Sequence, residues 1–206
     1  MSDTQTTTAS SVTRDYKGQD LPVHGDYVLD PAHTTIEFVA RHLMISKVRG
    51  RFTGFEGSIH VGDDPEDSKL VISVDASSID TSEPNRDAHL RSGDFLETDK
   101  YPKLTFKSTK VEHVDGNEYR VTGDLTMHGV TKAITFQAEY NGQSTMMGAH
   151  RAGLTARAKI NRKEFDLGFG SVAEAGQVAV SETVNLEIDL EAIQAATPAE
   201  ATPAGT

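Results

Sequence analysis

Residues 180–191, with the sequence VSETVNLEIDLE, alternate between apolar and polar side chains. One phase holds Val180, Val184, Leu186, Ile188 and Leu190, interrupted only by Glu182. The opposite phase holds Ser181, Thr183, Asn185, Glu187, Asp189 and Glu191. Because successive side chains of a strand leave its opposite faces, this period predicts a β-strand with one dry face and one solvated face.

The same alternation recurs along the chain and predicts a mostly antiparallel sheet. Asn141-Gly142 and His128-Gly129 are turn signals that tolerate positive φ and favour hairpins between neighbouring strands. The predicted strands cover residues 26–29, 34–41, 50–61, 69–75, 103–112, 119–127, 130–140, 149–161 and 177–191. So many one-sided strands must stack as two sheets or close into a barrel, and closure removes exposed edges. We therefore predict an all-β fold with a short helix, closed as an eight-stranded antiparallel barrel.

The inward phase of residues 149–161 suggests that this barrel is hollow. It contains His150, Ala152, Leu154, Ala156, Ala158 and Ile160, with alanine where a filled core would favour leucine or phenylalanine. A barrel of about eight strands encloses just enough space for side chains or for one small ligand. Small inward residues favour a ligand tunnel. The alternative is that each alanine accepts a bulky partner such as Phe38 or Phe136, which would leave the interior filled.

The segment 81–106, TSEPNRDAHLRSGDFLETDKYPKLTF, interrupts the strand pattern. Pro84 suits the first turn of a helix with Ser82 as its cap, and Asn85–Arg91 supplies about two turns of helix-forming residues. Tyr101-Pro102 then forces an extended conformation before the next strand. We predict one short helix beside the barrel.

Length and composition limit the classes of protein to which this chain can belong. A chain of 206 residues suits one domain, which we place at residues 21–193 between disordered tails at 1–20 and 194–206. The absence of cysteine excludes disulfides and thiolate chemistry, and the net charge of −11 argues against a nucleic-acid partner. No apolar run predicts a transmembrane segment, and the polar first twenty residues lack the apolar core of a signal peptide. We expect a cytoplasmic protein.

Ordered short motifs carry a family resemblance. They include LDPAHT at 29–34, GRF at 50–52, SIDT at 78–81, RDAHLR at 86–91, GDLT at 123–126, HGVT at 128–131 and Asn161-Arg162. Together these motifs resemble those of the YceI-like family of polyisoprenoid-binding, lipocalin-like barrels. The resemblance implies an elongated barrel with a short helix beside it, an amphiphile in the central tunnel and no known chemistry. It also suggests a homodimer. The chain departs from the family pattern by having Tyr27 in place of a tryptophan and by lacking the export signal of many relatives.

From the apolar phases and the resemblance we expect the chain to bind a long-chain isoprenoid or similar amphiphilic lipid, as a carrier, reservoir or sequestering protein. The expected tunnel lining is Ile36, Phe38, Phe52, Ile72, Val74, Phe106, Leu125, Ile134, Phe136, Leu154, Ala156, Ala158, Val184, Leu186 and Ile188. A hydrocarbon tail supplies the affinity of such a ligand, since burial contributes roughly 0.8 kcal/mol per CH₂.

Two basic groups are candidates for a polar head group. Arg86, His89 and Arg91 lie on the predicted helix, although the nearby Asp87 and Asp94 make a purely structural role the alternative. The run Arg41, His42, Lys47, Arg49 and Arg51 would attract a phosphate, but Lys47, Arg49 and Arg51 share the phase of a solvated strand face.

The sequence predicts no catalytic residue, no cofactor and no metal site. His33, His42, His89 and His128 lack the spacing of a metal-binding motif, and Gly170-Ser171 lacks the glycine pattern of a nucleophile elbow. Two alternatives stay open. One is a hydrolase or isomerase that uses a histidine and a carboxylate on the same amphiphile. The other is an interaction module with a filled barrel.

Overall fold

The structure is a computed structural model, and it describes residues 13–146, 148–168 and 180–195. Its single α-helix in that part of the chain is α1 (Pro84–Arg91). Three short 3-10 helices cover Pro65–Asp67, Ala76–Ser78 and Arg162–Phe165. The strands are β1 (Thr13–Tyr16), β2 (Gln19–Pro22), β3 (Gly25–Leu29), β4 (Thr35–His42), β5 (Ser46–Phe52), β6 (Phe55–Val61), β7 (Lys69–Asp75), β8 (Ile79–Asp80), β9 (Lys103–Asp115), β10 (Glu118–Met127), β11 (Val130–Met146), β12 (Ala149–Asn161) and β13 (Thr183–Gln194).

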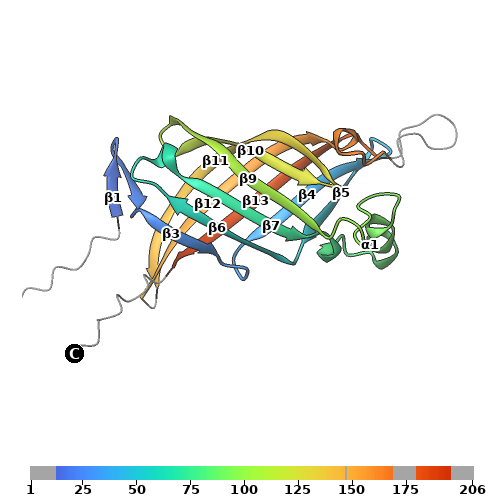
Figure 1. Cartoon of the computed structure of the whole chain (residues 1–206), viewed down its shortest axis with the longest axis horizontal. Coiled ribbons are helices and arrows are strands. Elements are labelled where there is room, and N and C mark those ends of the chain that lie inside the picture. The colour runs from blue at the N-terminus through green and yellow to red at the C-terminus, as the bar shows by residue number, and fades with distance from the viewer. Residues whose placement is uncertain (1–12, 147, 169–179, 196–206) are drawn as a thin grey trace, which may run out of the picture.

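The sheet closes into an elongated eight-stranded antiparallel barrel (Figure 1). The order around it is β12-β11-β10-β9-β7-β6-β3-β13, and β13 pairs back to β12. β13 pairs with β3 through residues 192–194 and with β4 through residues 185–189, so β3 and β4 share one strand position. The predicted fold class is therefore confirmed.

The predicted strand 50–61 is wrong as a single strand, because the structure breaks it into β5 and β6. At the break, Thr53 N–H donates to Ser78 O, and Gly54 O accepts from Asp75 N–H. The chain thereby changes partner from β8, which pairs with β5, to β7, which pairs with β6. A change of partner preserves the apolar alternation, so periodicity alone does not reveal it.

The predicted tail at residues 1–20 is corrected over residues 13–20. β1 and β2 form a hairpin whose turn places Lys17 and Gly18 at positive φ. Leu21 is buried, and the Arg14 guanidinium donates to the carbonyls of Gly62 and Asp63. The hairpin is thus held against one end of the barrel (Figure 1). Residues 1–12 and 196–206 of the predicted tails lie outside the described residues, as do residues 177–179 of the predicted last strand.

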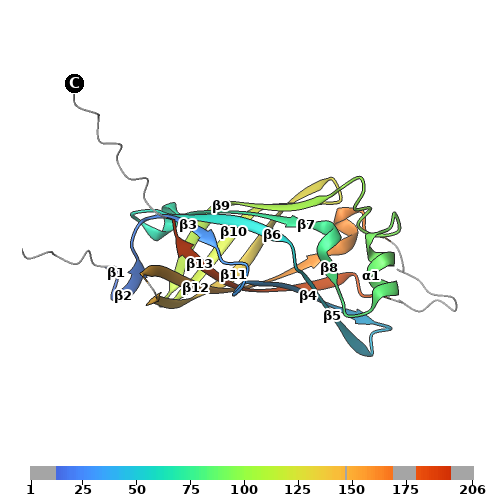
Figure 2. The ribbon, with the colours of Figure 1, turned by 90° about the horizontal axis from the view of Figure 1, so that it is seen from below.

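The predicted helix is present, but its cap differs. Glu83, rather than Ser82, accepts from the N–H groups of Asn85 and Arg86, and Ser82 adopts a positive φ. The longer glutamate side chain reaches both N–H groups from the adjacent position. α1 lies at the end of the barrel opposite the β1–β2 hairpin (Figure 2). In the described part of the chain no helix is long and apolar enough to cross a bilayer.

Candidate functional site: an apolar cavity inside the barrel

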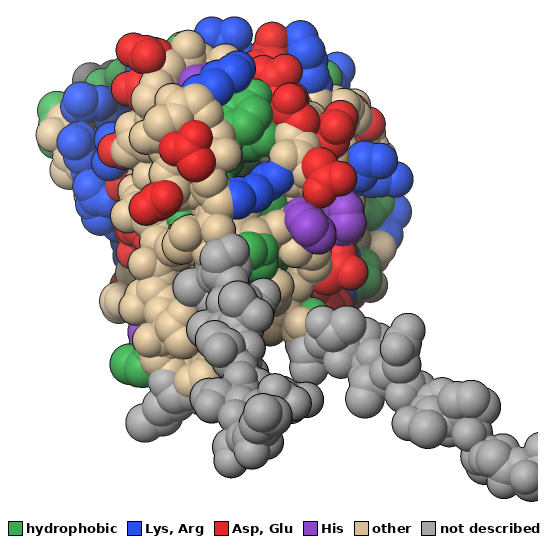
Figure 3. All heavy atoms as spheres, turned by 90° about the vertical axis from the view of Figure 1, so that its left-hand side faces the viewer, with side chains coloured by type: hydrophobic (Ala, Val, Ile, Leu, Met, Phe, Trp, Pro, Cys, Tyr) green, Lys and Arg blue, Asp and Glu red, His purple; other side chains and the backbone are tan. Residues whose placement is uncertain are grey.

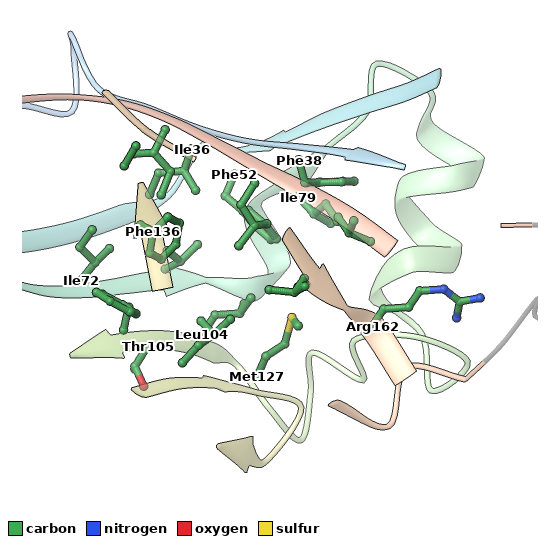
Figure 4. Close-up of a pocket in the computed structure, with 18 of the residues that line it drawn as sticks. Ile36, Phe38, Phe52, Ile72, Ile79, Leu104, Thr105, Met127, Phe136 and Arg162 are labelled. Atoms are coloured by element: carbon green, nitrogen blue, oxygen red, sulfur yellow. The ribbon is translucent and has the colours of Figure 1, made fainter. Parts of the chain in front are cut away.

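The barrel encloses a cavity of about 220 Å³. Its wall is formed by the inward faces of the barrel strands and, at one end, by residues that follow α1. Among the residues predicted to line a tunnel, the structure places these on the wall: Ile36, Phe38, Phe52, Ile72, Val74, Phe106, Leu125, Phe136, Leu154, Ala156, Val184, Leu186 and Ile188. Figure 4 shows several of them pointing toward a common interior space.

Two predicted residues do not reach this cavity. Ile134 is half-buried and packs against the core, and Ala158 is buried within it. Ile134 lies opposite Gly123, and the ring of Phe106 packs over that glycine. Both side chains point inward, as predicted, but other core side chains separate them from the open part of the interior.

Small residues account for part of the open space. Of the inward alanines predicted in residues 149–161, Ala156 lies on this wall, whereas Ala152 lines a second cavity and Ala158 is packed in the core. Ala40 and Ala138 of other strands also lie on the wall. Gly50 gives room to the ring of Phe38, which lies directly across from it on β4. Alanine and glycine residues therefore help to shape the interior.

A second cavity of about 120 Å³ lies toward the β1–β2 hairpin. Arg14, Leu21 and Pro22 of the hairpin help to line it. The two cavities share Ile59, Leu70, Val121, Ala138 and Leu154 as wall residues. They therefore lie next to each other along the barrel.

Three tyrosines also line the second cavity. Tyr27 donates its hydroxyl to Val23 O, and Tyr119 donates to Gln19 Oε1. The hydroxyl of Tyr140 is buried without a hydrogen-bond partner within the described residues, and burial raises its pKa well above the usual range. Its hydroxyl remains neutral at physiological pH and therefore adds no charge to the second cavity.

Arg162 is a wall residue that the sequence reasoning missed. Its side chain is buried, and its guanidinium donates to the backbone carbonyls of Leu167, Val180 and Ser181. Desolvation lowers its pKa from the usual value. The guanidinium points away from the apolar side chains in Figure 4. The accepting carbonyls belong to loop residues beside β12 and β13, so Arg162 holds these loops at the end of the cavity. In the sequence, the only signal for this residue was the Asn161-Arg162 motif.

Arg86 and Arg91 of α1, two of the three predicted head-group residues, donate hydrogen bonds to residues at β8. Arg86 Nε donates to Thr81 Oγ1 at 2.7 Å, and Arg91 Nη2 donates to Ile79 O at 2.6 Å. Asp87 is buried and accepts from the N–H and the hydroxyl of Thr81. These contacts are those of the structural alternative, in which the motif attaches the helix to the barrel. Contact of Arg86, His89 or Arg91 with a head group stays a prediction.

The helix region closes one end of the cavity. Leu90, Phe95 and Leu96 lie on the cavity wall. His89 Nε2 lies 2.9 Å from Asp94 Oδ2, and both side chains are about half exposed. The enzymatic alternative requires a histidine beside a carboxylate, and this is one such pair, but neither residue belongs to the cavity wall.

The basic run on β4 and β5 faces outward. Arg49 forms ion pairs with Glu37 and Glu187, and Arg51 pairs with Asp80. The side chains of Arg49 and Arg51 are more than half exposed, which fits the predicted solvated face.

Among the residues that the structure describes, one cluster of potential metal ligands is present: Asp30, His33 and Glu191. Arg151 Nη1 donates to both carboxylates, and His33 Nδ1 lies 2.9 Å from Asp30 Oδ2. The guanidinium therefore occupies the position between the two acids. Hydrogen bonds from Arg151, His33 and the Ala32 N–H hold the pKa of Asp30 well below its usual range. The cluster joins the β3–β4 loop to β12 and β13.

Comparison with known proteins identifies the family. The model of the YceI-like domain matches residues 27–192. Protein YceI of Shigella flexneri is 38% identical over 176 residues, which cover 84% of this chain and 88% of the relative. The YCEI protein of Campylobacter jejuni has a crystal structure that superposes with a TM-score of 0.66 at 32% identity, covering 76% of this chain and 90% of the other.

A structure described as a polyisoprenoid-binding domain from Saccharophagus degradans, implicated in plant cell wall breakdown, has a TM-score of 0.61 at 20% identity. It covers 82% of this chain and 98% of that domain, and at this identity it shows the fold alone. The matched residues span the whole barrel from β3 to β13. The chain belongs to the YceI-like family.

Proposed function

We propose that this protein binds a long-chain isoprenoid or similar amphiphilic lipid inside the barrel and acts as its carrier, reservoir or sequestering protein. The observation that carries the proposal is the wall of the larger cavity, which is apolar apart from Thr105 and Arg162. Such a wall favours hydrocarbon over water, because water would need polar partners there.

The volume of the cavity also supports a hydrocarbon guest. An engineered apolar cavity of about 150 Å³ binds benzene, so the present cavity of about 220 Å³ is large enough for a segment of an isoprenoid chain. At about 24 cal/mol per Å³, an empty cavity of 220 Å³ costs on the order of 5 kcal/mol of folding free energy. A guest that fills the space restores these lost contacts.

A hydrocarbon tail supplies enough free energy for affinity. Each five-carbon unit contributes roughly 3 to 4 kcal/mol before the costs of association are subtracted. The adjoining cavity of about 120 Å³ extends the apolar path toward the β1–β2 hairpin. We infer that the tail lies along the two cavities and that the polar head remains near an end of the barrel.

Native mass spectrometry of freshly purified full-length protein tests the proposal. We expect a population heavier than the polypeptide by the mass of one amphiphile, and organic extraction of the same sample should release that molecule. Repeated preparations that contain only the bare polypeptide, and that take up no added polyprenol, would contradict the proposal. The same spectra report copy number and so test the proposed homodimer. Cell fractionation tests the proposed cytoplasmic location.

A further inference from the structure

The turn between β4 and β5 exposes three consecutive apolar side chains. Leu43, Met44 and Ile45 have exposed fractions of 36%, 54% and 81%. We call residues 41–47 the hairpin tip. Figure 2 shows the β4–β5 hairpin projecting from the barrel at the end where α1 lies. Burial against the described residues does not account for their apolar character.

The backbone of the hairpin tip is unusual for these residue types. Leu43 and Met44 both have positive φ, and Ile45 N–H donates to His42 O at 3.1 Å. This is the pattern of a type I′ turn, for which Asn-Gly is the favoured sequence because these residues tolerate positive φ. The tip therefore carries large apolar residues where folding alone favours small polar ones, and unfavourable backbone conformations of this kind often mark functional positions.

The cations beside the turn carry a second signal. Arg41 and Lys47 lie directly opposite each other in the β4–β5 ladder, and both are exposed. Neither forms an ion pair within the described residues, in contrast to Arg49. Like charges at directly opposite positions destabilise a strand pair. An external anionic surface would remove that repulsion.

We propose that the hairpin tip docks onto an anionic lipid bilayer. Leu43, Met44 and Ile45 enter the interface between head groups and acyl chains, while the adjacent cations contact anionic head groups. This combination of an apolar edge and basic flanks is the one that interfacial segments use. The net charge of −11 does not prevent it, because charges more than about 8 Å away are screened at physiological ionic strength.

The hairpin tip is continuous with the cavity wall. Phe38 and Ala40 of β4 lie on that wall, a short distance along the strand from the turn. Docking therefore places this end of the cavity at the bilayer surface. At the opposite end, the face in Figure 3 shows acidic and basic side chains interspersed, with hydrophobic ones only in small separate areas. The docking proposal does not depend on occupancy of the cavity, so its test uses delipidated protein.

Co-sedimentation with extruded vesicles tests the docking. We expect wild-type protein to bind vesicles of equal parts phosphatidylcholine and phosphatidylglycerol, and not vesicles of phosphatidylcholine alone. Ile45→Asp should abolish binding, whereas Val114→Asp, at an exposed apolar residue near the β9–β10 turn, should retain it. The double variant R41Q/K47Q should bind about thirtyfold more weakly, since each basic residue near the surface contributes about fivefold.

The control for charge is K69Q/K107Q, which removes two exposed cations from β7 and β9 and should bind like wild type. No variant should have a lower unfolding midpoint than wild type, because every changed side chain is exposed. R41Q/K47Q should have a slightly higher one, because it removes the repulsion between Arg41 and Lys47. The proposal is overturned if wild type ignores anionic vesicles, binds neutral ones equally well, or responds alike to Ile45→Asp and Val114→Asp. Sedimentation velocity tests the other occupant: a dimer that Ile45→Asp converts to monomer, without vesicle binding, would assign the tip to a second copy.

Discussion

The ring of Phe38 packs over the backbone of Gly50, its direct partner across β4 and β5. A Cβ on Gly50 would lie 2.6 Å from Cε1 of Phe38 and 2.7 Å from Cγ2 of Thr81. These distances are shorter than van der Waals contact allows. The missing side chain of one residue thus fixes where a cavity-lining ring can lie.

Gly50→Ala should therefore shift the Phe38 ring and alter the cavity. Overpacking of this kind costs about 1 to 3 kcal/mol. We expect a lower free energy of unfolding in denaturant titrations and reduced uptake of a labelled polyprenol. Gly153→Ala on β12 is the matched control, because its Cβ would meet nothing closer than 3.7 Å. Equal effects of the two substitutions would show that the Phe38–Gly50 contact does not shape the interior.

Arg162→Met should destabilise the barrel at the cavity end. The substitution leaves the carbonyls of Leu167, Val180 and Ser181 without the guanidinium donors. We expect a loss of about 3 kcal/mol, because buried acceptors that lose their donors are costly. Denaturant titration measures this loss of unfolding free energy. Arg157→Met, at an exposed position of the preceding strand β12, should change stability by less than about 0.5 kcal/mol. A loss at Arg162 no larger than that at Arg157 would argue against this anchoring role.

The network around Asp30 predicts an acid dependence. Donors from Arg151, His33 and Ala32 lower the pKa of Asp30 in the folded protein, whereas the unfolded value is about 4. A lowered folded pKa means that the contribution to stability is present above about pH 4 and is lost as the pH falls toward the folded pKa.

The free energies of unfolding of wild type and Asp30→Asn should be measured from neutral pH down to acid pH. They should differ most near neutral pH and converge in acid. Asp26→Asn removes an exposed carboxylate from β3 and serves as the control. A difference between wild type and Asp30→Asn that stays constant down to acid pH would contradict the assigned cause.

Much of the barrel follows from side-chain alternation. In β13 the period of two places Val184, Leu186 and Ile188 on the cavity wall, and in β5 it directs Arg49 outward. Period two identifies a face, but it does not identify the partner strand. For that reason the exchange of partners at Thr53 and Gly54 could not be read from the sequence.

The cavity was predicted less completely than the barrel. Inward phase distinguishes Ala156 from its neighbours, but it does not distinguish Ala156, which borders open space, from Ala158, which is packed in the core. That difference depends on which larger side chains lie opposite, and these come from distant strands. Arg162 was missed for a related reason: a charged residue at a strand end reads as solvent-facing, and only the fold shows the backbone carbonyls that surround it.

The most direct test of the central claim is uptake of a labelled polyprenol by delipidated wild-type protein, by Ala156→Phe and by Ala133→Phe. Ala156 lies on the cavity wall, whereas Ala133 is exposed on the adjacent strand β11. We predict that Ala156→Phe binds at least about tenfold more weakly, since displacing two methylene groups of the guest forfeits that much affinity, while Ala133→Phe binds like wild type. Equal uptake by all three folded proteins would place the lipid outside the barrel and contradict the account.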